Sequence, residues 1–100
     1  MKNPNRETVS KLEELPNIGK KMAYYLEIAD ITTPQSLIGK NAFQLYNELC
    51  IKTDKKFDPC VIDVFMSAVD FMEGEEPKSW WKFTSKRKEL LATHPTLVSL

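Results

Sequence analysis

A short turn, Leu15-Pro16-Asn17-Ile18-Gly19, restricts the fold of this chain more than any other stretch. Apolar residues recur at helical spacing before the turn and resume after it, which predicts a helix on each side. Pro16 ends the first helix because its ring fixes φ and disfavours helical geometry in the residue before it. Asn17 and Gly19 tolerate positive φ, and Ile18 between them is expected to turn inward. The sequence therefore predicts two helices joined by a tight hairpin.

Backbone amides are expected to lie open where the second helix begins, because the first N–H groups of a helix have no acceptor within it. Together with the positive end of the helix dipole, such amides form a site suited to a phosphate. Gly19 lets an anion approach the backbone closely, and Lys20 and Lys21 add two positive charges at the same point. We therefore expect a phosphodiester ligand held by Asn17, Ile18, Gly19, Lys20 and Lys21. The alternative is a well-formed turn between two packed helices, with both lysines in solvent.

Start and stop signals divide the rest of the chain into further helices. Thr33-Pro34 has the form of an N-cap followed by a first-turn proline, and Asn41 and Asp58 are N-cap residues for two longer helices. The helix over residues 59–73 carries a broad apolar face, so we expect it at the centre of the core, and Gly74 ends it.

The turn, followed by Ala23 and Leu26, resembles the helix-hairpin-helix motif, a DNA-binding element that contacts the backbone without reading sequence. Its usual hairpin is Pro-Gly-Ile-Gly, and this chain has Asn17 where Gly is commoner. The hairpin is also similar to that of the C-terminal domain of TfoX-type competence regulators. Three later segments, in order, resemble a small bacterial family of pathogenicity-locus or mitomycin-resistance proteins: Leu45-Tyr46-Asn47-Glu48-Leu49-Cys50, Asp58-Pro59-Cys60-Val61 and Trp80-Trp81-Lys82-Phe83. The resemblance implies a role connected with DNA repair, damage tolerance or uptake in bacteria.

The expected fold is all-α, a compact SAM-like bundle of five to six helices built on a pseudo-duplicated helix-hairpin-helix unit. Residues 1–100 are expected to form one domain, because this length and a hydrophobic content of 42% suffice for one core. Its parts are a hairpin unit at 6–29, a degenerate second unit at 41–73 and an aromatic, basic segment at 79–94. The second loop lacks Gly and is too long for the usual hairpin, so we expect one phosphate site from hairpins and not two. Helices are expected over residues 6–15, 20–29, 34–37, 41–51, 59–73 and 84–93.

Charge is balanced in sum but not in distribution. Fourteen basic residues match fourteen acidic ones, which counts against tight DNA binding. Residues 63–76 are acidic without a base, with Asp63 and Asp70 expected to face solvent, and residues 78–88 are basic without an acid. No apolar run approaches the roughly 20 residues that a membrane span needs, and the N-terminus lacks the apolar part of a signal peptide. We expect a cytoplasmic protein with no membrane partner.

The basic C-terminal segment also carries aromatic residues. Aromatic rings beside cations can stack exposed bases, so we expect Trp81, Lys82, Lys86 and Arg87 to be secondary contacts to nucleic acid. Adjacent tryptophans point to opposite sides of a turn, and at least one of Trp80 and Trp81 is expected in the core. A basic run is equally typical of a solvated face.

No group of residues indicates catalysis, a metal site or a cofactor. Cys50 and Cys60 fit no metal-ligand spacing, and a site with His94 would need ligands from separate helices. His94 has no recognisable nucleophile setting. We therefore expect no enzyme but a binding module that holds the DNA backbone weakly and without sequence preference. The alternative is a protein–protein adaptor or a homodimer, docked through the Trp80/Trp81 surface or the hairpin.

Overall fold

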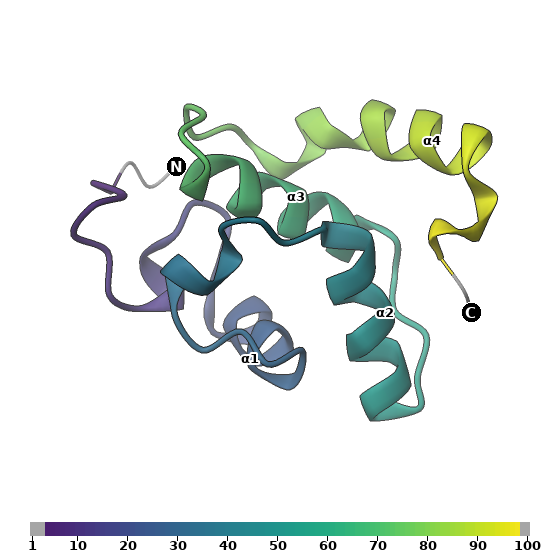
Figure 1. Cartoon of the computed structure of the whole chain (residues 1–100), viewed down its shortest axis with the longest axis horizontal. Helices are drawn as coiled ribbons and strands as arrows, with labels where there is room; N and C mark the ends of the chain where they lie inside the picture. Colours follow the sequence, from purple (N-terminus) through teal and green to yellow (C-terminus); the bar gives the residue numbers. More distant parts are fainter. Residues whose placement is uncertain (1–3, 99–100) are drawn as a thin grey trace.

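Helix α3, Cys60–Met72, lies at the centre of the molecule (Figure 1). The computed structural model describes residues 4–98, and every residue of α3 except Cys60 and Asp70 is buried. The predicted end at Gly74 is confirmed. Gly74 has φ +111°, its amide donates to the carbonyl of Phe71 at 3.2 Å, and the amide of Glu75 donates to that of Asp70 at 3.0 Å. This is the Schellman ending that a glycine after a helix favours.

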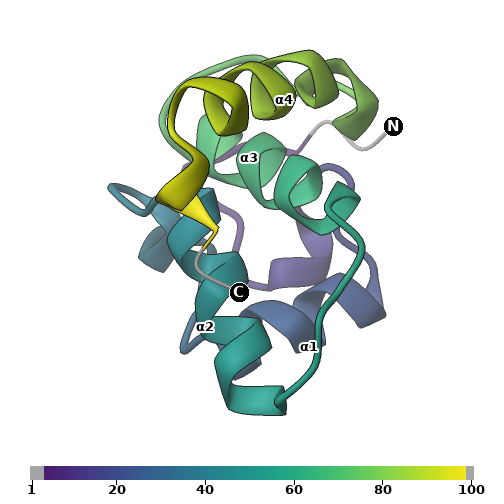
Figure 2. The same ribbon diagram turned by 90° about the vertical axis from the view of Figure 1, so that its right-hand side faces the viewer.

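The other helices pack around α3 on two sides. They are α1, Lys20–Ile28, α2, Ala42–Thr53, and α4, Thr84–Thr93. Helix α4 lies along one side of α3, while α1 and α2 lie on the other, as the two views show (Figures 1 and 2). Residues 4–98 contain no β-strand, and the Cα radius of gyration of 12.7 Å agrees with the value of about 13 Å for a single domain of this length. The all-α prediction is confirmed.

Two predicted N-caps place the middle helices. The Asn41 side chain accepts from the amides of Phe43 at 2.9 Å and Gln44 at 3.3 Å, so α2 begins where the sequence predicts. Thr33 accepts from the amide of Ser36 at 3.3 Å and is followed by Pro34. Local capping chemistry therefore determines where these elements start.

Two of the predicted helices are single turns of 3₁₀ helix. The segment 6–15 contains only Leu12–Glu14, and the segment before Gly39 contains only Pro34–Leu37. The Glu14 carboxylate accepts from the amides of Ser10 and Lys11, both at 2.9 Å, and so begins a new turn in the middle of the predicted helix. Pro16 ends that turn within a few residues, too few for an α-helix to form. Further 3₁₀ turns cover Trp80–Phe83 and Pro95–Leu97.

The apolar residues of the 6–15 segment are nevertheless buried as predicted. Val9 and Leu12 are at most 4% exposed, and Leu15 and Ile18 are 0% exposed. The hairpin is therefore anchored in the core by side chains on both sides of Pro16, although only a single 3₁₀ turn precedes it.

Candidate nucleic-acid interface

The hairpin before α1 is a tight turn with one left-handed residue. The Ile18 amide donates to the Leu15 carbonyl at 3.2 Å, which closes a four-residue turn with Pro16 second and Asn17 third. Asn17 has φ 67°, and a proline followed by a residue of positive φ is the pattern of a type II turn. Gly19, also expected to allow positive φ, is extended at φ −99° and ψ −168°. The conformational freedom that the turn requires is thus used at Asn17 and not at Gly19.

The side chain of Asn17 is bound within the protein. Its Nδ2 donates to the Ser67 hydroxyl on α3 at 3.1 Å and to the Lys78 carbonyl at 2.7 Å. Asn17 was predicted to contact nucleic acid, but these two bonds use its side-chain donor, so its side chain is not available to donate to a phosphate. The side chain of Ile18 is fully buried, so it too can contribute only through the backbone. Asn17 instead ties the hairpin to two segments that lie far away in the sequence.

The start of α1 is open, as a phosphate site requires. Its N-cap is Gly19, which provides no capping side chain, and the first hydrogen bond of the helix runs from the Ala23 amide to the Gly19 carbonyl at 2.9 Å. The amides of Lys20, Lys21 and Met22 precede that bond, so they have no acceptor within the helix. Gly19, Lys20 and Lys21 are exposed. The structure thus brings the three predicted contacts after Ile18 together at one exposed helix start.

The two lysines remain available to an anion. Among residues 4–98 neither Lys20 nor Lys21 forms an ion pair; Lys21 Nζ lies 5.8 Å from the ring centroid of Tyr25. Tyr24, which is 61% exposed, stands four residues after Lys20 and therefore on the same face of α1. The sequence interpretation did not name Tyr24 as an exposed neighbour of Lys20. The spacing of four residues between them is the signal that would have placed it there.

The four expected secondary contacts differ in how far their side chains are exposed to solvent. Trp81 is 61% exposed, whereas Trp80 is half-buried and packs against the core with its ring 5.9 Å from that of Trp81 at 82°. Lys82 and Lys86 are exposed, and Lys86 lines a shallow groove together with Asp70 and Glu73. Trp81 and Lys82 are therefore the contacts best placed to face a ligand.

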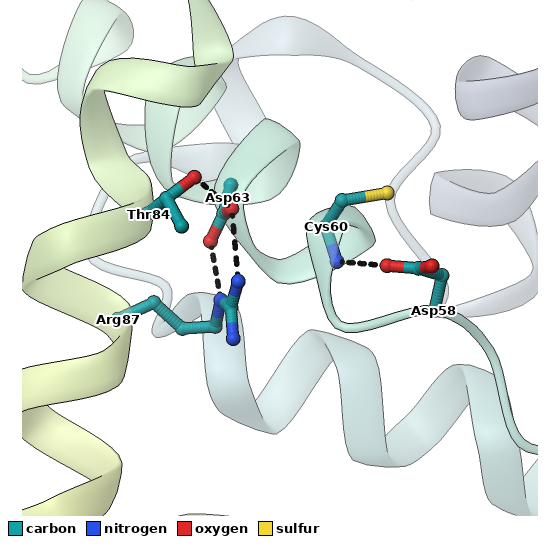
Figure 3. Close-up of polar contacts among 5 residues, drawn as sticks. All are labelled: Asp58, Cys60, Asp63, Thr84 and Arg87. Carbon is teal, nitrogen blue, oxygen red and sulfur yellow. Dashed lines mark hydrogen bonds and ion pairs between the residues drawn. The ribbon is translucent and has the colours of Figure 1, made fainter.

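The placement of Arg87 differs from the expectation. Its side chain is 12% exposed, and its Nε donates to Asp63 Oδ1 at 2.7 Å (Figure 3). The Thr84 hydroxyl donates to the other carboxylate oxygen of Asp63 at 2.7 Å. Asp63 is fully buried, so the expectation that it faces solvent is wrong, and the reason is that Arg87 and Thr84 satisfy its carboxylate inside the protein. Arg87 joins α4 to α3 and is turned away from an external ligand.

Comparison with known proteins identifies the family of this chain. Residues 5–89 match the pathogenicity-locus family. The chain belongs to the pathogenicity-locus family. It is also 39% identical over 83 residues to the mitomycin resistance protein McrB of Streptomyces lavendulae. The matched residues cover 83% of this chain and 79% of that protein. No solved structure matches the chain. The family match spans the hairpin, the buried pair and the exposed tryptophan.

A second helix start in this pathogenicity-locus protein is closed by its own carboxylate. Asp58 Oδ1 accepts from the Cys60 amide at 2.8 Å where α3 begins (Figure 3). That bond lowers the pKa of Asp58, and burial raises the pKa of the Cys60 thiol. The loop before α3 is further held by the Tyr46 hydroxyl, which donates to the Phe57 carbonyl. A negative charge therefore occupies the position that an external anion would take.

Other features of the described residues bear on cofactors and membranes. Among residues 4–98, no three side chains of the types that bind metal ions lie close enough to hold one, and Cys50 and Cys60 are free thiols. Within the same part of the chain, none of the helices is both long enough and apolar enough to span a bilayer. A hollow of about 520 Å³ lies at the end of α1, lined in part by Asp30, Lys40 and Glu48. Its mixed charges and its position away from the hairpin keep it separate from the start of α1.

Proposed function

We propose that this chain is a helix-hairpin-helix binding module that holds the DNA backbone without reading sequence. The observation that carries the proposal is the start of α1, where the exposed residues Gly19, Lys20 and Lys21 follow one another and no side chain caps the helix. Helix dipole, open amides and two ammonium groups act on a phosphate in the same direction. The role is one of binding and not of catalysis.

The charge distribution favours weak and non-specific contact. The formal net charge is zero, so the protein as a whole does not attract DNA, and attraction is limited to local groups. Asn41 at the start of α2 caps its own helix, and Arg87 in the first turn of α4 is paired with Asp63, so the proposal includes no reading of base edges by these side chains. The helix-hairpin-helix resemblance and the family assignment support a bacterial role in DNA repair, damage tolerance or uptake, in the cytoplasm.

The test compares two charge reversals in fluorescence anisotropy with a labelled duplex of random sequence at low salt. Lys20→Glu with Lys21→Glu changes the start of α1, and Lys55→Glu with Lys56→Glu changes the loop before α3. Each double variant alters the net charge by the same amount, so the loop variant is a matched control for loss of overall attraction. We expect the α1 variant to lose at least about tenfold in affinity and the loop variant much less.

Salt dependence gives the number of phosphates that are contacted. Two or three phosphate contacts predict a slope of about −2 to −3 in a plot of log affinity against log salt concentration, and the α1 variant should reduce its magnitude by about 2. Equal affinities of the α1 variant and the wild type would remove the hairpin from the mechanism. Equal losses in both double variants would reduce the effect to net charge alone.

The second candidate function, a protein–protein adaptor or homodimer, is favoured by one observation. Trp81 is 61% exposed, and exposed tryptophans are enriched among residues that anchor protein interfaces. Sedimentation of the wild type and of Trp81→Ala tests it. A self-associated species that disappears in the variant, without a change in DNA affinity, would favour the adaptor.

A further inference from the structure

Trp81 is held in a defined position although most of its side chain is in solvent. Its neighbour Trp80 packs against the hydrophobic core and meets the Trp81 ring edge to face, with centroids 5.9 Å apart. Phe83, two residues on, is 6% exposed and anchors the same 3₁₀ turn in the core. The exposed face of Trp81 is therefore offered by a rigid segment, so binding a flat ligand there would cost little ordering.

The segment that leads into this aromatic turn is joined to the hairpin by a direct hydrogen bond. Asn17, two residues before Gly19, donates to the carbonyl of Lys78 at 2.7 Å and also to Ser67 on α3. Trp81 follows Lys78 by three residues, so its backbone lies within about 11 Å of that carbonyl. The hairpin is thus in direct contact with the segment that carries the tryptophan, although 64 positions separate Asn17 from Trp81 in the sequence.

The charges next to Trp81 in the sequence suit a nucleic-acid strand. Lys78 and Lys82 flank it and are exposed, and residues 77–88 contain no acidic side chain. The nearest acidic residues in sequence, Glu75 and Glu76, lie in the turn that follows α3, where Arg6 Nη2 donates to the Glu75 carbonyl at 2.7 Å. From that turn the segment between α3 and α4 runs back along α3 (Figure 1).

We propose that Trp81 stacks on an unpaired base of a DNA strand whose backbone is bound at the hairpin. The ligand class is then DNA with exposed bases, such as single strands and gapped duplexes, in preference to intact duplex. In intact duplex the bases are already stacked on one another, so Trp81 has no free base face to cover. The inference rests on the proposed function, since it needs the backbone to be held at the start of α1.

The test measures the affinity of wild type, Trp81→Leu and Trp81→Phe for three probes that share one labelled strand. The probes are that strand alone, a duplex with a short gap, and the intact duplex. Because base stacking on an aromatic side chain contributes strongly, Trp81→Leu should weaken binding of the first two probes by about 5- to 100-fold and leave the intact duplex unchanged. Trp81→Phe keeps an aromatic face and should recover most of the loss. Circular dichroism and thermal unfolding show that each variant is folded.

A spectroscopic signal separates stacking from a general loss of contact. The chain has two tryptophans, so Trp80→Phe leaves Trp81 as the sole source of tryptophan emission. Its emission should be quenched by the single strand and by the gapped duplex, but not by the intact duplex. Asn17→Gly removes both side-chain bonds of Asn17. It should weaken binding to the single strand and to the gapped duplex more than binding to the intact duplex.

Failure of this inference differs from failure of the proposed function. If Trp81→Leu binds all three probes like the wild type while Lys20→Glu with Lys21→Glu loses affinity, stacking is overturned and backbone binding stands. If single-strand binding falls in Trp81→Leu but not in the double lysine variant, the shared surface is overturned together with the hairpin mechanism. If Trp81→Leu changes only self-association in sedimentation, Trp81 is a protein contact and the inference fails.

Discussion

Helices α1 and α3 both follow a turn that reverses the chain, yet they begin in opposite ways. Helix α1 starts at Gly19, which has no capping side chain, and two exposed lysines follow it. Helix α3 starts beside Asp58, whose carboxylate accepts from the amide of Cys60. The backbone groups at a helix start are the same in both cases. What differs is whether the protein supplies its own anion, and this decides where an external phosphate can bind.

The two helices also differ in how they use charge along their length. On α1 only Ala23 and Leu26 are buried, and its lysines point to solvent. On α3 the charged residue Asp63 is fully buried and paired with Arg87 from α4. Substitutions of charged residues on α1 should therefore change binding, whereas those inside α3 should change stability.

The largest expected effect is the loss of the internal pair of α3. Asp63→Ala leaves Arg87 largely buried without its partner, and breaking such a pair costs about 3–5 kcal/mol of unfolding free energy. Urea unfolding followed by circular dichroism measures the loss. Lys20→Ala on α1 is the contrasting control and should stay within about 0.5 kcal/mol of the wild type.

A second variant of the pair shows whether charge or packing is responsible. Asp63→Leu combined with Arg87→Leu replaces the pair by apolar groups and should retain more stability than Asp63→Ala alone. A change in Asp63→Ala as small as that in Lys20→Ala would contradict the internal role of the pair.

The next largest effect is expected when a substitution gives the start of α1 a carboxylate like the one at the start of α3. Gly19→Asp places a carboxylate at the N-cap, and Gly19→Asn places a neutral cap of the same shape there. Gly19 has φ −99° and open space where a Cβ would stand, so neither change strains the backbone. We expect Gly19→Asp to lose at least about tenfold in DNA affinity, or about 1.4 kcal/mol, with a smaller loss for Gly19→Asn. Anisotropy with duplex DNA measures both, and equal affinities for all three proteins would contradict an anion site at this helix start.

Local signals in the sequence predict a large part of this fold. Asn41 and Gly74 mark helix ends because a cap needs only a side chain or a glycine within a few residues of the backbone that it serves. The burial of Leu15 and Ile18 beside Pro16 follows in the same way from spacing around the turn. These features depend on neighbours in sequence, so the sequence contains them directly.

The parts that were not predicted depend on partners far away in the chain. Asp63 reads as a solvent-facing residue until Arg87, 24 positions later, is placed beside it. The bond from Asn17 to Lys78 joins residues that are 61 positions apart, and no pattern near either one indicates it. For the candidate site, the lysines and the open helix start were predictable, whereas the connection to the exposed Trp81 was not.

The loop before α3 should give a smaller effect that depends on pH. Burial raises the pKa of Tyr46 to about 12, and its hydroxyl donates to the Phe57 carbonyl. Because the phenol ionises less readily in the folded than in the unfolded protein, its contribution to stability is present below about pH 10 and is lost as pH rises towards 12. Tyr46→Phe should cost about 0.5–1.5 kcal/mol near neutral pH.

Above pH 10 the free energy of unfolding of the wild type should fall more steeply than that of Tyr46→Phe, by at most about 1.4 kcal/mol per pH unit. Urea unfolding at a series of pH values measures the difference between wild type and variant. A difference that stays constant up to pH 12 would show that the phenol of Tyr46 does not titrate with unfolding.

The smallest expected effect is the loss of the cap that closes α3. Asp58→Ala removes the carboxylate from the amide of Cys60, so the unfolding midpoint should fall, but by less than in Asp63→Ala. Because the bond to Cys60 lowers the pKa of Asp58, the cap stabilises the folded protein above the ordinary carboxyl pKa and is lost as pH falls through the lowered value. The difference between wild type and Asp58→Ala should therefore be constant near neutral pH and should shrink in acid. Asp58→Asn keeps an acceptor without the charge, so it should recover most of the midpoint, and the difference between Asp58→Asn and Asp58→Ala should be independent of pH. If wild type and Asp58→Ala unfold alike at neutral pH, the carboxylate does not close this helix start, and the two helices would then begin alike, without a carboxylate cap.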